Sequence, residues 1–439
     1  MISRRALLRT ATAAAVSTAA GMMGGCGSSG RPLQVAVVWS GDERERFREV
    51  VNHYESSVDV LSVGDNIDAF LRARRRAGSS PDVAILPRPG LVTEYARAEL
   101  LSSLGKEIAN PFPQLRRDLL EFEGKLFGAW VKAAHKSLFW RLPPGDPFGT
   151  WDDPQNWDEL KHTVRTLAKT DRTHVAPLAI GAADGWVLTD WFENVLAAIS
   201  PPDVYRDLAK GKSAWSNHDA VHQALSHLGD LWGIRGAFSG GGQRALTTQF
   251  GESVIQVITG QAAMVFEGDF VATLAGSYRK QGGNKLTHFR FPDIEKDRTP
   301  KNRPLVVGGD AAVVFEGSHE GHDFVEWLTQ PDTFTPWIRK GGYLSPHPSA
   351  SVKEYPDARI RDLADELSTA RDLRFDLSDQ LPSGFTGADG VGIWRILQKF
   401  FAEVAIEGTG VRRAVCQTIE ELDDAAKDAA RQAQDGRGR

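Results

Sequence analysis

Cysteine is scarce in this chain, because only Cys26 and Cys416 occur among 439 residues. If Cys26 carries a lipid, no intramolecular disulfide can form, and we expect Cys416 to be a small residue of the core. An excess of positive charge is also missing, since 52 Lys and Arg face 57 Asp and Glu, for a formal net charge of −5. A mildly acidic surface argues against nucleic acid as a partner.

Two motifs of known chemistry are incomplete. The glycines at 240–242 are not followed by the Gly-Lys-Ser/Thr that a phosphate-binding loop requires. Residues 319–322 read His-Glu-Gly-His, which lacks the zinc-protease spacing of two histidines four positions apart around a glutamate. We therefore expect no metal site and no cofactor.

The N-terminus has the layout of a secretory signal. Three arginines occur among the first nine residues, and residues 10–20 carry no charge. That stretch is shorter than the roughly 20 apolar residues that a membrane-spanning helix needs. The sequence Met-Met-Gly-Gly-Cys at 22–26 resembles the lipobox of bacterial lipoproteins, which implies removal of residues 1–25 and acylation of Cys26. Ser-Arg-Arg at 3–5 also resembles a twin-arginine export signal.

Predicted strands alternate with predicted helices after the N-terminal segment. The first three strands are residues 33–39, 58–63 and 81–86. Strands joined through helices by short turns pair in parallel, which indicates an α/β fold. Ligands of such open sheets bind beyond the carboxyl ends of the strands, so the loops after these three strands should share one rim. The length of the chain suggests two lobes.

Seven stretches between residues 39 and 379 carry a family resemblance. They are residues 39–43, 80–90, 177–186, 260–269, 308–312, 341–346 and 375–379. In this order they resemble the family 1 extracellular solute-binding proteins of carbohydrate ABC importers, the maltose-binding-protein-like class. The resemblance is closest to members that take up α-glucosides and related oligosaccharides. Phe270 stands where the family often has Trp.

The resemblance implies an α/β, two-lobed periplasmic-binding-protein fold of type II, with a ligand cleft between the lobes and a hinge. The expected parts are a tether at 26–32, a first lobe at 33–139 and 292–336, a second lobe at 140–291 and 337–425, and a flexible tail at 426–439. It also implies a monomeric, non-enzymatic protein held by its lipid on the outer face of the bacterial cytoplasmic membrane. Its expected partners are a carbohydrate ligand and the permease subunits of an ABC transporter.

Sugar recognition needs flat apolar faces for C–H surfaces and planar polar groups for hydroxyls, and the first lobe offers both. Trp39 and Glu43 are the preferred pair. Asp42 and Asp65 begin helices, so capping explains them equally well. Arg88 lies between two prolines at a strand end and is assigned to the site.

Further candidates lie on later strands and loops. Trp130 is either a core residue or a ligand contact at the end of its strand, and Lys132 follows it. In the second lobe, Asp184 precedes Trp186, the preferred stacking residue, and a helix cap is the alternative for Asp184. Twelve tryptophans occur in the chain, and we expect most to lie in the core and three or four to be available to a ligand.

Two pairs complete the predicted site. Glu267 and Asp269 flank a glycine at a strand end, so one could accept ligand hydrogen bonds while the other is structural. Gly309 would let backbone N–H groups approach a ligand beside Asp310.

Two other functions remain open. Glu267 and Asp269 could be the acid and base of a secreted glycosidase. Alternatively, Arg88, Lys132 and Arg141 could meet the phosphate of a glycerophosphodiester carried by a binding lipoprotein.

Overall fold

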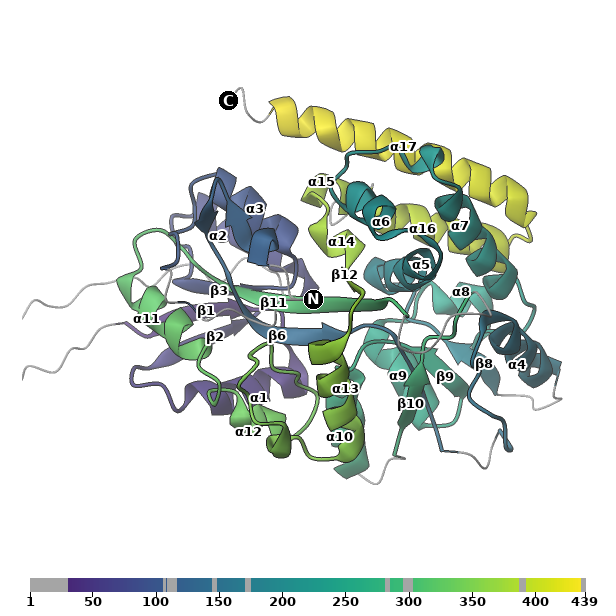
Figure 1. The fold of residues 1–439 in the computed structure, drawn as a ribbon, viewed down its shortest axis with the longest axis horizontal. Coiled ribbons are helices and arrows are strands. Elements are labelled where there is room, and N and C mark those ends of the chain that lie inside the picture. The colour runs from purple at the N-terminus through teal and green to yellow at the C-terminus, as the bar shows by residue number, and fades with distance from the viewer. Residues whose placement is uncertain are drawn as a thin grey trace, which may run out of the picture. The chain divides into compact units, whose positions relative to one another are not determined.

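Two β-sheets, each covered by helices, organise the computed structural model (Figure 1). The structure describes residues 31–105, 108, 117–143, 148–169, 175–280, 285–294, 303–386 and 392–435. The fold described below lies in the unit that begins at Leu33. The predictions for the signal peptide at 1–25, for acylation of Cys26 and for the export signal lie outside the described residues.

The first sheet has the strand order β12-β11-β3-β1-β2, and β6 also pairs with β11. Its strands are β1 (Leu33–Val37), β2 (Val58–Ser62), β3 (Val83–Leu86), β6 (Ala129–His135), β11 (Leu305–Val314) and β12 (Leu373–Phe375). The predicted parallel pairing of the first three strands is confirmed, because β1 pairs in parallel with both β2 and β3. Their carboxyl ends therefore lie at one edge, where the Ser62 hydroxyl donates to the Trp39 carbonyl oxygen at 2.8 Å.

Helices complete the first lobe. They are α1 (Gly41–Val51), α2 (Ile67–Arg76), α3 (Pro89–Arg97), α11 (His319–Leu328), α12 (Thr335–Ile338) and α13 (Ala358–Thr369). Short elements are the 3₁₀ turns Gly64–Asn66, Arg117–Leu120 and Val352–Glu354 and the hairpin of β4 (Glu121–Phe122) and β5 (Lys125–Leu126).

The second sheet has the order β10-β7-β9-β8. Its strands are β7 (Leu138–Arg141), β8 (Ala176–Ala179), β9 (Ala262–Phe266) and β10 (Thr287–Arg290). Its longer helices are α4 (Trp157–Lys169), α5 (Gly185–Ile199), α7 (Asp219–Trp232), α9 (Phe250–Ile258), α10 (Val271–Lys280), α16 (Ile393–Ala405) and α17 (Val411–Asp435). The shorter ones are α6 (Pro202–Ala209), the 3₁₀ turn Trp215–Asn217, α8 (Gly241–Ala245), α14 (Leu377–Gln380) and α15 (Ser383–Thr386).

Tryptophan fills much of the core, as expected. Among the largest fully buried side chains are Trp157, Trp191, Trp215, Trp232 and Trp337. Four others are half-buried: Trp151, Trp186, Trp327 and Trp394.

The chain first passes between the sheets at residues 136–137, between β6 and β7. The chain returns to the first sheet after β10 and leaves that sheet again after β12. The last boundary is later than the expected residue 337, because β12 pairs in parallel with β11 and Trp337 packs against Trp39. Sequence periodicity missed this, since a three-residue strand gives almost no signal.

Several local predictions change. Cys416 is exposed on α17 and is not a core residue. Glycines 241 and 242 begin the short helix α8, and the short helices α14 and α15 follow Phe375. Helix α17 continues beyond residue 425 as far as Asp435. Within the described residues, no helix combines the length and the apolar character that crossing a membrane requires.

Candidate functional site

The rim of the first sheet gathers several predicted residues into one buried network, here called the rim cluster: Trp39, Glu43, Lys132, Asp269 and Asp310. The Trp39 indole N–H donates to the Asp310 carboxylate at 2.9 Å, and the Lys132 ammonium donates to Glu43 at 2.6 Å. Strand β11 supplies Asp310 and strand β6 supplies Lys132. Trp39, Asp310, Lys132 and Glu43 therefore use their polar groups on one another, and Asp269 joins the cluster through the charge of Lys132.

Trp39 is packed on more than one side. Its ring meets Phe47 edge-on at 4.9 Å and Trp337 at 5.0 Å, and the residue is only 2% exposed. The Lys132 nitrogen lies 5.8 Å from the Trp39 ring centroid and 5.3 Å from that of Trp337, which is cation–π range. Trp39 thus belongs to the core of the first lobe and leaves little ring face for a ligand.

Charge balance in the rim cluster rests on one lysine. Burial would lower the pKa of Lys132, but Glu43, Asp310 and Asp269 outweigh it and raise that pKa. Burial raises the pKa of Asp310 to about 6 and that of Asp269 to about 7, and Lys132 opposes both shifts. The Asp269 carboxylate also accepts the His135 backbone N–H at 2.8 Å.

Other first-lobe candidates have separate surroundings. Asp42 is exposed in the first turn of α1, and the Asp65 side chain lies outside the described residues. Arg88 is buried at the N-cap of α3, and its guanidinium carbon lies 5.8 Å from the ring centroid of Trp394 in α16. Arg88 therefore joins α3 to α16.

Trp130 and Gly309 have packing roles. Trp130 is 4% exposed, and its ring lies 5.1 Å from that of Phe375. A Cβ on Gly309 would lie 2.9 Å from the Lys132 carbonyl oxygen and 3.0 Å from the Trp130 ring. The glycine thus permits β6 to pair closely with β11.

A second group of residues, here called the aromatic cluster, lies in the second lobe: Trp186, Phe250, Glu267 and Phe270. The three rings are half-buried and lie 5.3 to 6.0 Å apart. They come from the starts of α5 and α9 and from the loop after β9. Such spacings are typical of packed aromatic pairs, so the rings form one apolar surface.

Two local features position these rings. The Asp184 carboxylate accepts the Phe250 backbone N–H at 2.7 Å, which ties the start of α9 to the start of α5. Position 268 must be small, because a Cβ there would lie 2.3 Å from the Phe270 ring. Asp184 is therefore an anchor for Phe250, whereas Trp186 offers a partly exposed ring.

Glu267 follows β9 and is 1% exposed. Neither carboxylate oxygen has a hydrogen-bond partner among the described residues. Burial raises the pKa of Glu267 well above its ordinary value, Asp190 and Asp184 raise it further, and Lys136 opposes the shift. An unpartnered buried carboxylate is energetically costly, which makes Glu267 the outstanding polar group of this region.

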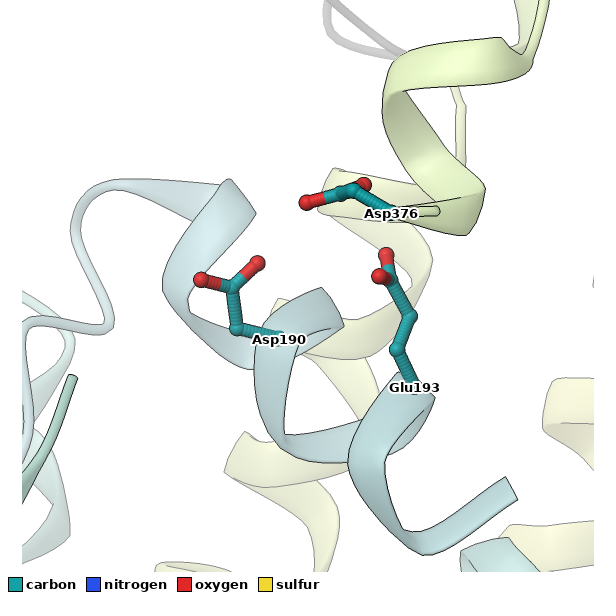
Figure 2. Close-up of side chains that lie close together, drawn as sticks. All are labelled: Asp190, Glu193 and Asp376. Atoms are coloured by element: carbon teal, nitrogen blue, oxygen red, sulfur yellow. The ribbon is translucent and has the colours of Figure 1, made fainter. Parts of the chain in front are cut away.

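Lys136 lies at the first crossing between the sheets and forms ion pairs with three aspartates. Its ammonium donates to Asp190 at 3.2 Å and to Asp376, and it lies 3.8 Å from Asp379. Asp190 and Glu193 project from α5 toward Asp376, which precedes α14 (Figure 2). The Lys136 ammonium thus ties α5 to the segment after β12.

The carboxylates of Asp190, Glu193 and Asp376 are close enough to share a cation, since their ligand atoms lie within 4.8 Å of one another. The Lys136 ammonium already binds Asp190 and Asp376. Glu193 accepts the backbone N–H groups of Leu377 and Ser378 at 2.9 and 3.0 Å. These bonds account for the trio as a structural network, and we assign no metal to it.

Sequence reasoning missed Lys136, Asp190 and Phe250. Lys136 and Asp190 stand within largely apolar stretches, where a charged residue indicates a buried partner. That signal could have been used, whereas Phe250 carries no signal of its own beyond its aromatic side chain.

Comparison with known proteins identifies the family to which this chain belongs. Residues 41–333 match the family described as bacterial extracellular solute-binding protein, which is more than half of the chain. The chain belongs to this family, whose members are the extracytoplasmic solute-binding components of ABC importers. Its fold is the two-lobed α/β fold of periplasmic binding proteins.

Individual relatives are distant but similar over most of their length. The osmoprotective compounds-binding protein GgtB of Synechocystis sp. is 27% identical over 379 residues, which cover 82% of this chain and 86% of GgtB. The alpha-glucosides-binding periplasmic protein AglE of Rhizobium meliloti is 27% identical over 373 residues, 80% of each chain. The solved bacterial solute receptor AcbH, described with an exclusive preference for β-D-galactopyranose, has a TM-score of 0.75 at 14% identity and covers 90% of this chain and 98% of its own.

Proposed function

We propose that this chain captures a mono- or oligosaccharide between its two lobes and delivers it to the permease of an ABC importer. The observation that carries the proposal is Glu267, a buried carboxylate without a hydrogen-bond partner among the described residues, three positions before Phe270, whose half-buried ring packs with those of Trp186 and Phe250. A carboxylate can accept two hydroxyl hydrogens at once. Aromatic faces suit the C–H surface of a sugar ring.

The printed names of the relatives support the same class of ligand. AglE binds α-glucosides, and AcbH prefers a galactopyranose. Both are consistent with a polyhydroxylated ligand that has no net charge.

A glycerophosphodiester is less well supported. Two of the three cations that could meet its phosphate are already paired, because Lys132 binds Glu43 and Arg141 lies 2.7 Å from Asp153. Arg141 is also stacked over Trp151 at 4.1 Å. A phosphate would have to compete with these contacts.

A glycosidase is also less well supported. Asp269 accepts the His135 N–H and lies in the field of Lys132, so it is engaged by the rim cluster and not by Glu267. The family consists of binding proteins. We therefore propose a binder without catalytic activity.

A thermal-shift screen of purified protein tests the proposal. The panel contains disaccharides, amino sugars and glycerophosphodiesters, because any ligand that binds the native state raises the melting temperature by mass action. We expect neutral sugars to raise it in wild-type protein and in Glu403→Gln, a control on α16, but much less in Glu267→Gln. A shift only with phosphodiesters, or equal shifts in all three proteins, would contradict the proposed site.

We further propose that the mature protein is a monomer whose acylated Cys26 holds it on the outer face of the cytoplasmic membrane. The sequence before Leu33 supports this, because a stretch that resembles a lipobox follows a segment with the layout of a secretory signal. Cys26→Ala should move the protein from the membrane fraction to the soluble extracytoplasmic fraction. Retention of the variant in the membrane would refute the anchor.

A further inference from the structure

We propose that ligand capture at Glu267 releases one proton to solvent, so that the affinity for the sugar rises with pH. This inference rests on the proposed function, because it assumes that ligand hydroxyls donate to Glu267. It extends that function to a pH-dependent regulation of the same site.

The first step is the state of Glu267 without ligand. Its side chain is 1% exposed and both oxygens lack partners among the described residues, while its backbone N–H is used by the Leu138 carbonyl at 2.9 Å. Among the described residues, no donor therefore stabilises a negative charge on this side chain. A buried carboxylate in such surroundings takes up a proton in preference to remaining ionised.

The second step is the nearest cation. Lys136 acts on Glu267, but its ammonium is held by Asp190, Asp376 and Asp379. One positive charge thus faces three aspartates before Glu267 is counted. Burial raises the pKa of Asp190 to about 8 and that of Asp379 well above its ordinary value although Lys136 opposes both shifts, so this ammonium does not fully stabilise even the aspartates that it contacts and is not free to pair with Glu267.

The charged groups on the other elements around β9 either disfavour ionisation of Glu267 or are paired elsewhere. The start of α5 adds Asp184, whose charge disfavours ionisation of Glu267. The neighbouring strand β7 carries Arg141, paired with Asp153, and helix α9 carries Glu252, paired with Arg244. Asp269, on the same loop as Glu267, lies in the field of Lys132.

The third step is the effect of the ligand. Burial and the two aspartates keep the pKa of Glu267 well above its ordinary value in the free protein. Hydroxyl groups that donate to the carboxylate stabilise its ionised form and lower this pKa. The O–H bond of the Glu267 carboxyl breaks, and its proton passes to the buffer while the ligand hydroxyls replace it.

Titration calorimetry in two buffers of different ionisation enthalpy, phosphate and Tris at the same pH, measures the number of protons released. The probe is the sugar that gives the largest shift in the thermal screen. We expect up to one proton released per sugar at neutral pH. The association constant should rise by as much as about tenfold per pH unit below the pKa of the free protein and become constant above it.

Variants separate Glu267 from other groups. Glu267→Gln should bind the sugar more weakly and release no proton. Glu403→Gln changes a buried carboxylate that lies 3.9 Å from Lys399, and it should release as many protons as wild type. The wild-type pH profile alone tests the proposal if Glu267→Gln does not fold. Binding without proton release, or release that persists in Glu267→Gln, would overturn the proton linkage but leave the sugar-binding function intact. Failure of every carbohydrate to bind would overturn both.

Discussion

The rim cluster and the aromatic cluster contain the same kinds of side chains but use them differently. In the rim cluster, Trp39 donates to Asp310 and Lys132 donates to Glu43. In the aromatic cluster, three rings are half-buried and Glu267 has no partner among the described residues. We therefore propose that the rim cluster stabilises the first lobe, whereas the aromatic cluster meets the ligand.

The difference comes from the neighbours of each carboxylate. Glu43 accepts a hydrogen bond from the Lys132 ammonium, whereas Glu267 accepts none among the described residues, because the Lys136 ammonium donates to Asp190 and Asp376 instead. A carboxylate that accepts from a cation is satisfied without ligand. One without a cation gains most when hydroxyl donors arrive.

The largest expected effect is loss of stability on removal of the rim lysine. Lys132→Met leaves Glu43, Asp269 and Asp310 without their common positive charge, and breaking a buried pair in this way costs about 3–5 kcal/mol of unfolding free energy. Urea unfolding measures it. Lys125→Met, at an exposed position, should change stability by less than about 0.5 kcal/mol. Wild-type stability in Lys132→Met, combined with loss of sugar binding, would make Lys132 a ligand contact.

The second effect is a dependence of stability on pH. Burial raises the pKa of Asp269 to about 7 and that of Asp310 to about 6, above the values of the unfolded chain. The stability that these groups contribute is thus fully present below about pH 4 and is lost as the pH rises through 6 to 7.

We expect the unfolding free energy to fall by on the order of 2–4 kcal/mol between pH 5 and pH 8, since each pKa unit corresponds to about 1.4 kcal/mol. Asp310→Asn should flatten part of this slope in urea titrations at several pH values. Burial also raises the pKa of Glu267, which adds to the same fall, so the difference between wild type and Asp310→Asn measures the part that belongs to the rim cluster. A stability that rises over this range would contradict the charge balance assigned to the rim cluster.

The third effect concerns affinity. Glu267→Gln should weaken sugar binding by about 1.5–3 kcal/mol, the usual value of a hydrogen bond to a charged group, with no loss of unfolding free energy. Glu43→Gln should do the reverse and lower stability with little change in affinity. Calorimetric titration and thermal melts of both variants measure this contrast, and equal affinity losses in the two would remove the distinction between the clusters.

The smallest effect is expected for the stacking ring. Trp186→Ala should weaken binding by about 1 kcal/mol, and Trp186→Phe should restore part of it, because a flat apolar face remains. Trp327→Ala removes a half-buried tryptophan from α11 in the first lobe and should leave affinity unchanged. If both alanine variants bind as wild type, Trp186 does not contact the sugar.

Much of the fold was predictable because its signals are local. The apolar strands near residues 33, 58 and 83 and the helices between them dictated parallel pairing, which the register of β1 with β2 and β3 confirms. The boundary between the lobes after residue 337 was not predictable, because it depends on β12, three residues that pair with a strand far away in the sequence.

Residue type and position in the chain predicted candidate site residues, but not which of their polar groups are already hydrogen-bonded within the protein. Position after a strand end drew attention to Trp39 and Glu267 alike. Their difference lies in partners distant in sequence: Asp310 is 271 residues from Trp39, and Lys132 is 89 residues from Glu43. Only the folded structure shows which polar groups are already bound to each other.

The most direct test of this account is a crystal structure of the protein with its sugar bound. We expect ligand hydroxyls within about 3 Å of the Glu267 carboxylate and a sugar face against Trp186, with the Lys132–Glu43 and Trp39–Asp310 bonds retained. A sugar that displaces the Lys132–Glu43 bond and leaves Glu267 without a contact would contradict it.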